Sequence, residues 1–238
     1  LNIELSRHHE LVLPFLKSEN PDVVCLQELL EEDFEMYKRE LGMNGVHRVL
    51  SYITDNVHTE SRGKREGIAI FSKNIVDSGF VFHVGTEKDV DITFDEYNSR
   101  ENIIKNRALL WVDVKNNNEV SRIVTTHLTI TRHGEATPVQ IEDNKRFISN
   151  IKKLGEFVLC GDTNAPRGMG AYEEIAKEFK DNIPEKYISS LDKDLHRAKG
   201  INLMVDCLFT TPEYKAKDVH LVGGVSDHMA VIAEINKK

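Results

Sequence analysis

The sequence has few cysteines, and none of them forms a pair typical of a metal or redox centre. Three of the 238 residues are cysteine, at Cys25, Cys160 and Cys207. Each lies inside an apolar run, and the chain contains no Cys-x-x-Cys motif. Because isolated thiols in apolar runs usually serve as small buried hydrophobic groups, we expect reduced cysteines rather than disulfides or a zinc site.

Signals of secretion and membrane insertion are also lacking. The chain has no Asn-x-Ser/Thr sequon and no apolar stretch long enough to cross a bilayer, and its first residues lack a charged-then-apolar leader pattern. We therefore expect a soluble, cytoplasmic monomer without stable membrane association. The opening residues Leu1-Asn-Ile-Glu are typical of the end of a strand whose beginning lies upstream.

Positive charge is in deficit, since the formal net charge is −8 at pH 7. This balance argues against bulk electrostatic capture of nucleic acid or of an anionic membrane, so a polyanion would need a local basic patch. Aromatic residues make up only 7% of the chain and are scarce near the motifs described below, which leaves few surfaces for base stacking. The hydrophobic share of 40% is ordinary for a globular protein, and we expect one α/β domain over residues 1–238.

Short apolar runs bounded by turn residues predict strands, and longer periodic segments predict helices. The expected strands are 23–26, 46–53, 67–72, 76–84, 157–159, 203–210, 219–222 and 229–235, with a hairpin formed by 107–114 and 120–128. The expected helices are 6–19, 31–41, 139–154 and 171–179, and the acidic segment 85–105 is expected to be a long surface loop. This mixture predicts two mixed sheets packed face to face, with helices outside.

Four acidic residues stand next to apolar runs scattered along the whole chain. They are Glu28, Asp162, Asp206 and Asp227. An acid at the point where a buried strand meets its loop lies at the rim of the core, where it is partly desolvated and still meets a ligand. Because Mg²⁺ prefers one or two carboxylates together with waters and phosphate oxygens, this set suggests a divalent-cation site for phosphate chemistry.

Each acidic segment also has a structural interpretation. Glu28 is equally typical of an acid at the amino end of the next helix. The spacing of Asp162 and Asn164 places both side chains on one face of extended backbone, where the carboxylate can take a proton from a water that the amide orients. The same residues, in Gly161-Asp-Thr-Asn-Ala-Pro, are typical of an Asx turn.

Two histidines have candidate carboxylate partners. His228 follows Asp227, and adjacent strand residues point to opposite faces, so both serve one site only where the backbone is irregular. Asp206 can orient His228 by accepting a ring proton, and Glu66 can do the same for His127. The alternative for each is a structural histidine. Two oriented histidines and a metal would stabilise a phosphorane-like transition state from several sides.

Two sets of basic residues are candidates for contacts with an anionic substrate. His196 and Arg197 form a small cluster with Lys193 and Lys199, typical of a solvated surface or of a phosphate contact. The second set would frame a substrate groove and consists of Arg62, Lys64, Arg65, Arg132 and Arg167.

Taken together, the ordered motifs resemble the endonuclease/exonuclease/phosphatase superfamily over nearly the whole chain. The motifs are Asn2, Gln27-Glu28, Glu66-Gly67, Thr126-His-Leu128, Gly161-Asp-Thr-Asn164, Asp206 and Ser226-Asp-His228. The resemblance implies a DNase I-like four-layer α/β sandwich with the site at one edge of the two sheets. It also implies cleavage of a phosphoester by an activated water with Mg²⁺ or Mn²⁺ as cofactor.

The resemblance also implies a role for each matched residue. Metal binding falls to Glu28 with Asn2 beside it and to Asp227, while Glu4 stands where some members have an Asp near the metal. Asp162 would activate the water, and Asn164 would position the phosphate. His228, paired with Asp206, would bind the phosphoryl oxygens, and Arg107 would contact the phosphate. His127, with Glu66 as its partner, matches the second histidine of DNase I-like and sphingomyelinase-like members.

Three functions are compatible with these residues. The first is a phosphodiesterase acting on nucleic acid, at a strand end or protein–DNA adduct, since the Gly-Asp-Thr-Asn motif resembles that of 5′-tyrosyl-DNA phosphodiesterases. The second is a phosphatase or phosphodiesterase for a lipid headgroup, inositol phosphate or nucleotide. The third is a non-catalytic binding protein on the same scaffold.

Overall fold

A computed structural model describes residues 1–53, 59–90, 106–131 and 134–238. Its largest sheet has six strands in the order β4-β5-β6-β7-β9-β8, and a second sheet has the order β1-β3-β2. Strands β10 and β11 form a separate hairpin. The strands are β1 (Val23–Leu30), β2 (Asn44–Tyr52), β3 (Arg65–Ser72), β4 (Ile75–Val84), β5 (Arg107–Asn116), β6 (Glu119–His127), β7 (Val158–Asp162), β8 (Lys180–Asp181), β9 (Asp206–Thr210), β10 (Tyr214–Val222) and β11 (Ala230–Lys237).

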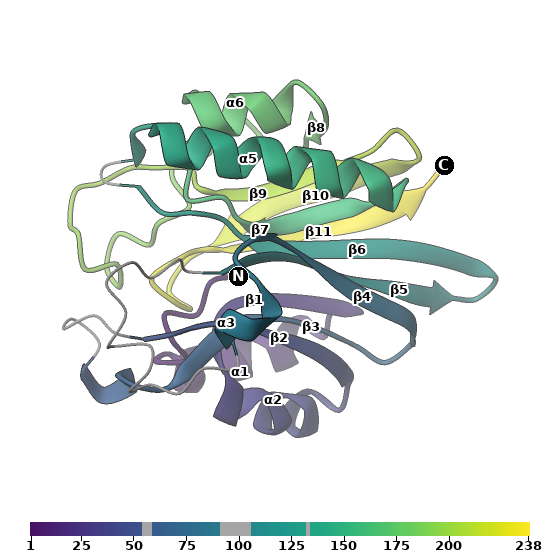
Figure 1. The fold of residues 1–238 in the computed structure, drawn as a ribbon. Coiled ribbons are helices and arrows are strands. Elements are labelled where there is room, and N and C mark those ends of the chain that lie inside the picture. The colour runs from purple at the N-terminus through teal and green to yellow at the C-terminus, as the bar shows by residue number, and fades with distance from the viewer. Residues whose placement is uncertain (54–58, 91–105, 132–133) are drawn as a thin grey trace.

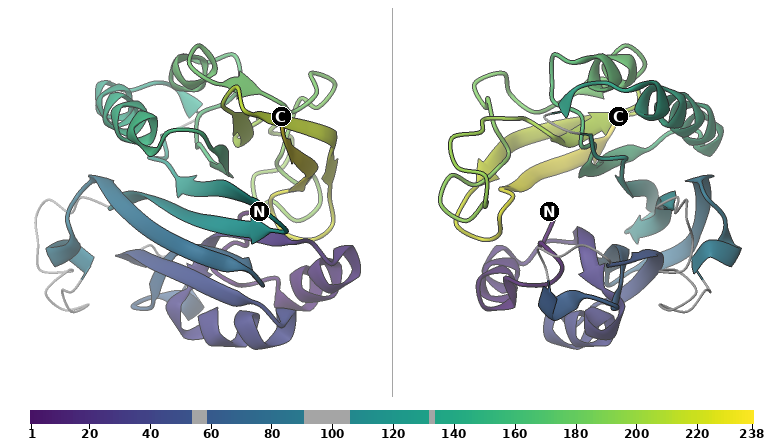
Figure 2. Two further views of the ribbon diagram at one scale, coloured as in Figure 1. Left: turned by 90° about the vertical axis from the view of Figure 1, so that its right-hand side faces the viewer. Right: turned by 60° about the vertical axis from the view of Figure 1, so that its left-hand side comes forward.

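Helices cover the two outer faces of the stacked sheets (Figures 1 and 2). The six-stranded sheet is covered by α5 (Pro138–Ile151), which continues into η4 (Lys152–Leu154), and by α6 (Gly170–Ala176). The three-stranded sheet is covered by α1 (His9–Glu19) and by α2 (Phe34–Leu41), which follows η1 (Glu31–Asp33). Two short helices, η2 (Thr59–Ser61) and α3 (Glu87–Val90), complete the described elements. The expectation of a four-layer α/β sandwich is thus confirmed.

Three hydrophobic cores separate the four layers, and strand alternation supplies them. On β3, Ile68 and Ile70 enter the central core between the sheets, whereas Ala69 and Phe71 face α1 and α2. On β5, Leu110 lies in the central core, and its neighbours alternate in the same way. Because both faces of each sheet are buried, the strands read as nearly continuous apolar runs.

The expected elements are present, and the differences concern their ends. Residues 107–114 and 120–128 form the predicted hairpin, whose turn has Asn117 in the left-handed region at φ 53°. The helix expected from residue 6 begins only at His9, because Glu4, Leu5 and Ser6 all have positive φ. The predicted loop 85–105 lies largely outside the described residues.

Two further observations concern the cysteine thiols and the length of the helices. Cys25, Cys160 and Cys207 are free thiols. Across the described ranges, every helix is too short or too polar to span a bilayer.

Candidate active site

Strand pairing in the six-stranded sheet brings three of the predicted residues to one edge. Strands β6 and β7 run parallel and place His127 opposite Asp162. Strands β7 and β9 run antiparallel and place Asp162 opposite Asp206. Asp162 ends β7, which extends beyond the end expected at residue 159. Asp206 begins β9, so the strand expected from residue 203 starts later than predicted.

Asp162 is the centre of this arrangement. Its Oδ1 accepts a hydrogen bond of 2.7 Å from the backbone N–H of Asn164, and its Oδ2 accepts one of 3.2 Å from the Asn2 amide. The Nε2 atoms of His127 and His228 lie 3.6 Å and 4.0 Å from Asp162 Oδ2. Three segments remote in sequence therefore surround one carboxylate oxygen.

Glu28 joins the site through a bulge in β1. The same Asn2 amide nitrogen that donates to Asp162 also donates to Glu28 Oε1 at 3.1 Å. The register of β1 against β3 shifts between Gln27 and Leu29, and Glu28 has a φ of 56°. A bulged residue turns its side chain away from the regular alternation, so Glu28 reaches the sheet edge from within its strand. The prediction that the strand ends before Glu28 was wrong.

Burial, together with the charges of neighbouring carboxylates, raises the pKa values of three acids in the site. Burial, followed by the charges of Glu66 and Asp227, raises the pKa of Glu28 to about 7. Burial also raises the pKa of Asp162 to about 6, with Asp206 contributing in the same direction. The pKa of Asp227 is raised as well, again chiefly by burial. Each of these shifts means that the ionised cluster is unfavourable on its own, and a bound cation would relieve the repulsion.

The donor set fits a hard divalent cation bound in part by water and substrate. Among the described residues, no group of three or more His, Cys, Asp or Glu side chains converges closely enough to form a complete metal site. Mg²⁺ needs only one or two protein carboxylates, because waters and phosphate oxygens fill its other positions. Glu28 and Asp227 supply oxygen ligands of this kind. The Asn2 side-chain oxygen accepts a hydrogen bond of 3.0 Å from the Glu4 N–H, and its amide nitrogen faces Glu28 and Asp162, so the metal-binding role of Asn2 stays a prediction.

His228 is fixed and charged by its carboxylate partner. Its Nδ1 lies 2.7 Å from Asp206 Oδ2, so the ring donates this proton and directs Nε2 towards Asp162. Burial lowers the pKa of His228, but the charges of Asp206, Asp162 and Asp227 outweigh it and hold the pKa well above its usual range. The residues before β11 are irregular, as the adjacency of Asp227 and His228 requires.

Two further predicted residues are buried beside the carboxylates. Arg107 begins β5 and is only 3% exposed; burial lowers its pKa, while the charges of Glu66 and Asp162 oppose that shift. Glu66 accepts a hydrogen bond from the Ser51 hydroxyl through Oε1, and its Oε2 has no hydrogen-bond partner within the described structure. Glu66 therefore bonds Ser51 through Oε1, and the orientation of His127 by Glu66 stays a prediction.

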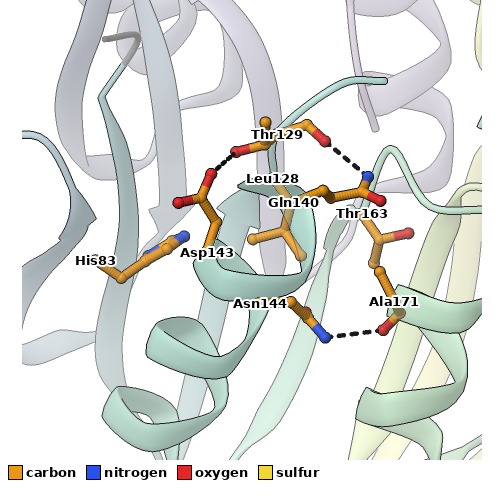
Figure 3. Close-up of a pocket in the computed structure, with 8 residues that line it drawn as sticks. All are labelled: His83, Leu128, Thr129, Gln140, Asp143, Asn144, Thr163 and Ala171. Atoms are coloured by element: carbon orange, nitrogen blue, oxygen red, sulfur yellow. Dashed lines mark hydrogen bonds between the residues drawn. The ribbon is translucent and has the colours of Figure 1, made fainter. Parts of the chain in front are cut away.

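Asn164 is held from behind by α5. Its backbone is left-handed, with φ 49°, and its Nδ2 donates to the Leu128 carbonyl at 3.0 Å. Gln140 on α5 donates to the carbonyls of Thr129 and Asn164 at 2.9 and 3.4 Å. A cavity of about 10 Å³ lies in this region, lined by His83, Leu128, Thr129, Gln140, Asp143, Asn144, Thr163 and Ala171 (Figure 3). This cavity has room for roughly one water molecule, so it is too small to admit a substrate.

Most of the basic residues predicted to frame a substrate groove are engaged in other contacts. Lys64 pairs with Glu32 at 2.7 Å, and Arg167 pairs with Asp181 at 2.9 Å while also donating to the Ile183 carbonyl. Arg167 therefore supports the fold instead of facing a substrate. Arg65 lies 3.6 Å from the nearest carboxylate oxygen of Glu31, and Arg132 falls outside the described residues.

Sequence reasoning missed the residues that hold Asp206. Ser190, fully buried, accepts hydrogen bonds from the backbone N–H groups of Val205 and Asp206 at 3.1 and 3.0 Å. It lies in an irregular segment whose composition is that of an ordinary loop. No signal in the sequence distinguishes Ser190 from the neighbouring Ser189.

Several solved structures share this fold. A protein of the endonuclease/exonuclease/phosphatase family from Bacteroides vulgatus is 18% identical, with a TM-score of 0.72 over 100% of this chain and 97% of that one. The human Nocturnin catalytic domain with bound sulfate is 15% identical, with a TM-score of 0.70 over 98% and 87% of the two chains. A humanized D. rerio TDP2 is 17% identical, with a TM-score of 0.62 over 100% and 97%.

Sequence comparison gives the family itself. No curated protein sequence matches the chain significantly. A sequence profile of the Endonuclease/Exonuclease/phosphatase family matches residues 1–228, which include all the motifs discussed above. The chain therefore belongs to the endonuclease/exonuclease/phosphatase family.

Proposed function

We propose that this protein is a Mg²⁺- or Mn²⁺-dependent phosphodiesterase that uses an activated water to cleave a phosphodiester in nucleic acid. Members of its family are hydrolytic phosphoesterases that generally use divalent metals. The observation that carries the proposal is the Asn2 amide, which bridges Glu28 and Asp162 between two histidines. This cluster combines oxygen ligands, a proton acceptor and cationic donors around one small volume.

Asp162 is the proposed proton acceptor for the attacking water. Its Oδ1 accepts the short hydrogen bond of 2.7 Å from the Asn164 backbone, and its Oδ2, which accepts the longer bond of 3.2 Å from Asn2, is the oxygen that takes the proton. With a pKa of about 6, Asp162 is ionised at neutral pH and a stronger base than an ordinary aspartate. Asn164, fixed by Leu128, keeps its side-chain oxygen available to the water or the substrate.

His228 and His127 are the proposed donors to the phosphoryl oxygens. The Asp206 carboxylate keeps His228 protonated at neutral pH, so its Nε2–H meets the negative charge that develops as the water attacks. The Nε2 atom of His127 lies 3.6 Å from Asp162 Oδ2 and 3.8 Å from Glu28 Oε1, which places it on the other side of the same volume. Arg107, buried beside them, adds a fixed positive charge.

Glu28, Asn2 and Asp227 are the proposed metal ligands. A divalent cation held by these residues would polarise the phosphoryl group as a Lewis acid and would neutralise developing negative charge. The raised pKa of Glu28 supports this assignment, because a carboxylate whose ionised form is penalised by its neighbours is stabilised by a cation.

The choice of nucleic acid as the substrate class is a separate and more specific step of the proposal. Two histidines flank Asp162, and the second of them, His127, matches a position that DNase I-like members fill with histidine. Sphingomyelinase-like members share this feature, so a lipid phosphodiester is the main competing substrate. No amphipathic basic helix that would hold the protein on a bilayer is present among the described helices.

A substrate panel with defined metal tests the proposal. The full chain is assayed with excess Mg²⁺ or Mn²⁺ on bis(p-nitrophenyl) phosphate, single-stranded DNA, RNA, a 5′-tyrosyl oligonucleotide, sphingomyelin and inositol phosphates. We expect hydrolysis of the generic diester and preference for a nucleic-acid substrate, both abolished by EDTA and restored by metal.

The outcomes separate the three functions. Full activity in EDTA would overturn the metal assignment. Preference for sphingomyelin or an inositol phosphate would replace nucleic acid by the competing substrate class. Absence of turnover on every substrate, with metal binding retained by calorimetry, would identify a binding protein on the same scaffold.

A further inference from the structure

The segment 192–199 is anchored to the irregular segment before β11 that carries Asp227 and His228. The backbone N–H of Asp192 donates to the Asp227 carbonyl at 2.8 Å. The Asp192 carboxylate accepts from the backbone N–H of Gly224 at 2.6 Å and from those of Asp194 and Leu195 at 2.8 and 2.9 Å. A single buried carboxylate thus fixes this loop to the turn that precedes Asp227, so the loop keeps a defined position at the rim of the site.

His196 lies at the inner side of this loop, against His228. The two ring centroids are 6.3 Å apart at an interplanar angle of 69°, an edge-to-face contact. The His196 backbone N–H donates to the Asp192 carbonyl at 3.0 Å, and its Nδ1 lies 3.2 Å from the Ala198 backbone nitrogen. These contacts occupy the backbone and Nδ1, and within the described structure no hydrogen bond uses Nε2.

Arg197, next in the chain, is an uncommitted cation. It is exposed and makes no hydrogen bond or ion pair within the described part of the chain. The two lysines of the loop are placed differently: Lys199 donates to the Asp194 carbonyl, and Lys193 lies 3.9 Å from the Asp194 carboxylate with 88% of its side chain exposed. Arg197 is therefore the free guanidinium nearest in sequence to His196.

We propose that His196 and Arg197 form a second anion-binding position beside the phosphoryl site, which binds a second phosphate group of the substrate. The inference rests on the proposed phosphodiesterase function. A guanidinium pairs with phosphate through two parallel N–H donors, and a histidine Nε2–H adds a third donor. The chain is acidic overall, at −8, so local donors of this kind are required to hold a polyanion. The expected consequence is selection for substrates that carry a phosphate next to the cleaved one.

Two matched nucleotides test this selection. Thymidine 5′-(p-nitrophenyl phosphate) carries the scissile diester alone, and its 3′-phosphorylated form adds one phosphate on the same nucleoside. With the full chain and Mg²⁺, we expect a kcat/KM about tenfold higher for the 3′-phosphorylated substrate, expressed mainly in KM, because one charge-assisted contact is worth roughly this factor. The preference should shrink as the salt concentration rises.

The variants Arg197→Gln and His196→Ala should each reduce this ratio towards one. The ratio is the readout because loss of the His196 ring also removes a contact with His228 and can slow both substrates equally. Arg146→Gln, which removes an exposed arginine of α5 far along the chain, is the matched control and should keep the ratio.

The results distinguish this inference from the proposed function. Hydrolysis of both nucleotides with equal kcat/KM, or an unchanged ratio in Arg197→Gln, would overturn the second anion position and leave the phosphodiesterase intact. Hydrolysis of neither nucleotide, together with no turnover of the generic diester, would overturn the proposed function and this inference with it.

Discussion

Asp206 is the residue on which the charge of His228 depends. Its carboxylate lies 2.7 Å from the ring, and its charge is the largest of those that raise the pKa of His228 against the effect of burial. Asp206→Asn keeps the volume and a hydrogen-bonding group but removes that charge. The imidazolium then loses its main stabilising neighbour while remaining buried.

For Asp206→Asn we therefore expect the pKa of His228 to fall, and turnover at pH 8 to drop by about 10²–10³-fold as the charged donor is lost. The activity loss should lessen as the pH is lowered, since protons then restore the imidazolium. NMR titration of the His228 ring and a pH–rate profile measure both effects. An unchanged ring titration would show that Asp206 does not control the charge.

Asp162 has a different role, because the proposed chemistry uses it as a base. Asp162→Asn retains an acceptor for the Asn164 N–H but removes the basic oxygen, so we expect kcat to fall by about 10²–10⁴-fold, the usual contribution of a general base. Circular dichroism and thermal unfolding check that the fold persists. Asp218→Asn makes the same chemical change at an exposed left-handed position of β10, with φ 50°, and should leave kcat within about twofold. Near-normal turnover in Asp162→Asn would remove this residue from the mechanism.

At the scale of elements, the parallel pair β6–β7 places the site. Gly161 pairs with Thr126, and a Cβ added at Gly161 would lie 2.3 Å from the Thr126 backbone oxygen. A side chain at Gly161 would push the two strands apart just where they hold His127 and Asp162. This glycine is required by a close approach of backbones, which no local pattern in the sequence reveals.

Gly161→Ala should therefore lower both stability and activity. We expect a loss of about 1–3 kcal/mol in the free energy of unfolding, the usual range for overpacking, and a fall in kcat from the displaced side chains. Gly170→Ala, at the start of α6, is the control, because its Cβ would meet only Ala136 at 3.5 Å, an ordinary contact. Urea denaturation and turnover assays compare the two variants. Equal stability would mean that β6 and β7 separate at no cost.

The elements also show which features a sequence can and cannot predict. The run from Phe157 to Gly161 is continuous and apolar, so a strand leading to Asp162 was predictable. Strand β7 is observed there and extends beyond the expected end at residue 159 to include Asp162. Glu28 lies beside Asn2, 3.1 Å from its amide nitrogen, but the expected strand end before it was wrong. The strand continues through it by a bulge, and a bulge arises from pairing with β3, which is not encoded locally. The contact of His196 with His228 likewise joins two loops that only the fold brings together.

At the scale of the whole molecule, the carboxylate cluster links metal binding to stability. The pKa of Glu28 is raised from 4.5 to about 7, so the folded state binds this proton more tightly than the unfolded state does. In the absence of metal, stability is therefore lost as the pH rises from about 4.5 to 7. Glu28→Gln removes the repulsion and should raise the Tm of the metal-free protein at pH 8.

Metal binding should act in the opposite direction on the wild type. A cation that binds only the folded state raises Tm with concentration, and Glu28→Gln should lose most of this rise because a principal ligand is gone. Differential scanning fluorimetry with and without Mg²⁺ measures both changes. Glu174→Gln, at an exposed position on α6, is the control and should keep the Mg²⁺-dependent rise. An equal rise in Glu28→Gln and wild type would place the metal elsewhere.

Acid stability depends on buried histidines outside the carboxylate cluster. Burial, with a smaller effect of Arg107, lowers the pKa of His83 from 6.5 to about 3. The unfolded state therefore binds this proton more readily between those two pH values, and stability is lost as the pH falls from about 6.5 to 3. By pH 5 this one residue should cost about 2 kcal/mol, since each pH unit below the unfolded pKa costs about 1.4 kcal/mol.

His83→Gln tests this effect because glutamine cannot be protonated at that pH. We expect urea denaturation to give a smaller loss of stability between pH 7 and pH 5 for the variant than for the wild type, whatever its stability at pH 7. His220→Gln, at an exposed position of β10, should keep the wild-type dependence. If His83→Gln loses as much stability as the wild type over this range, His83 takes up its proton in the folded state, and acid must destabilise the fold through other groups such as His47, whose pKa burial lowers to about 4.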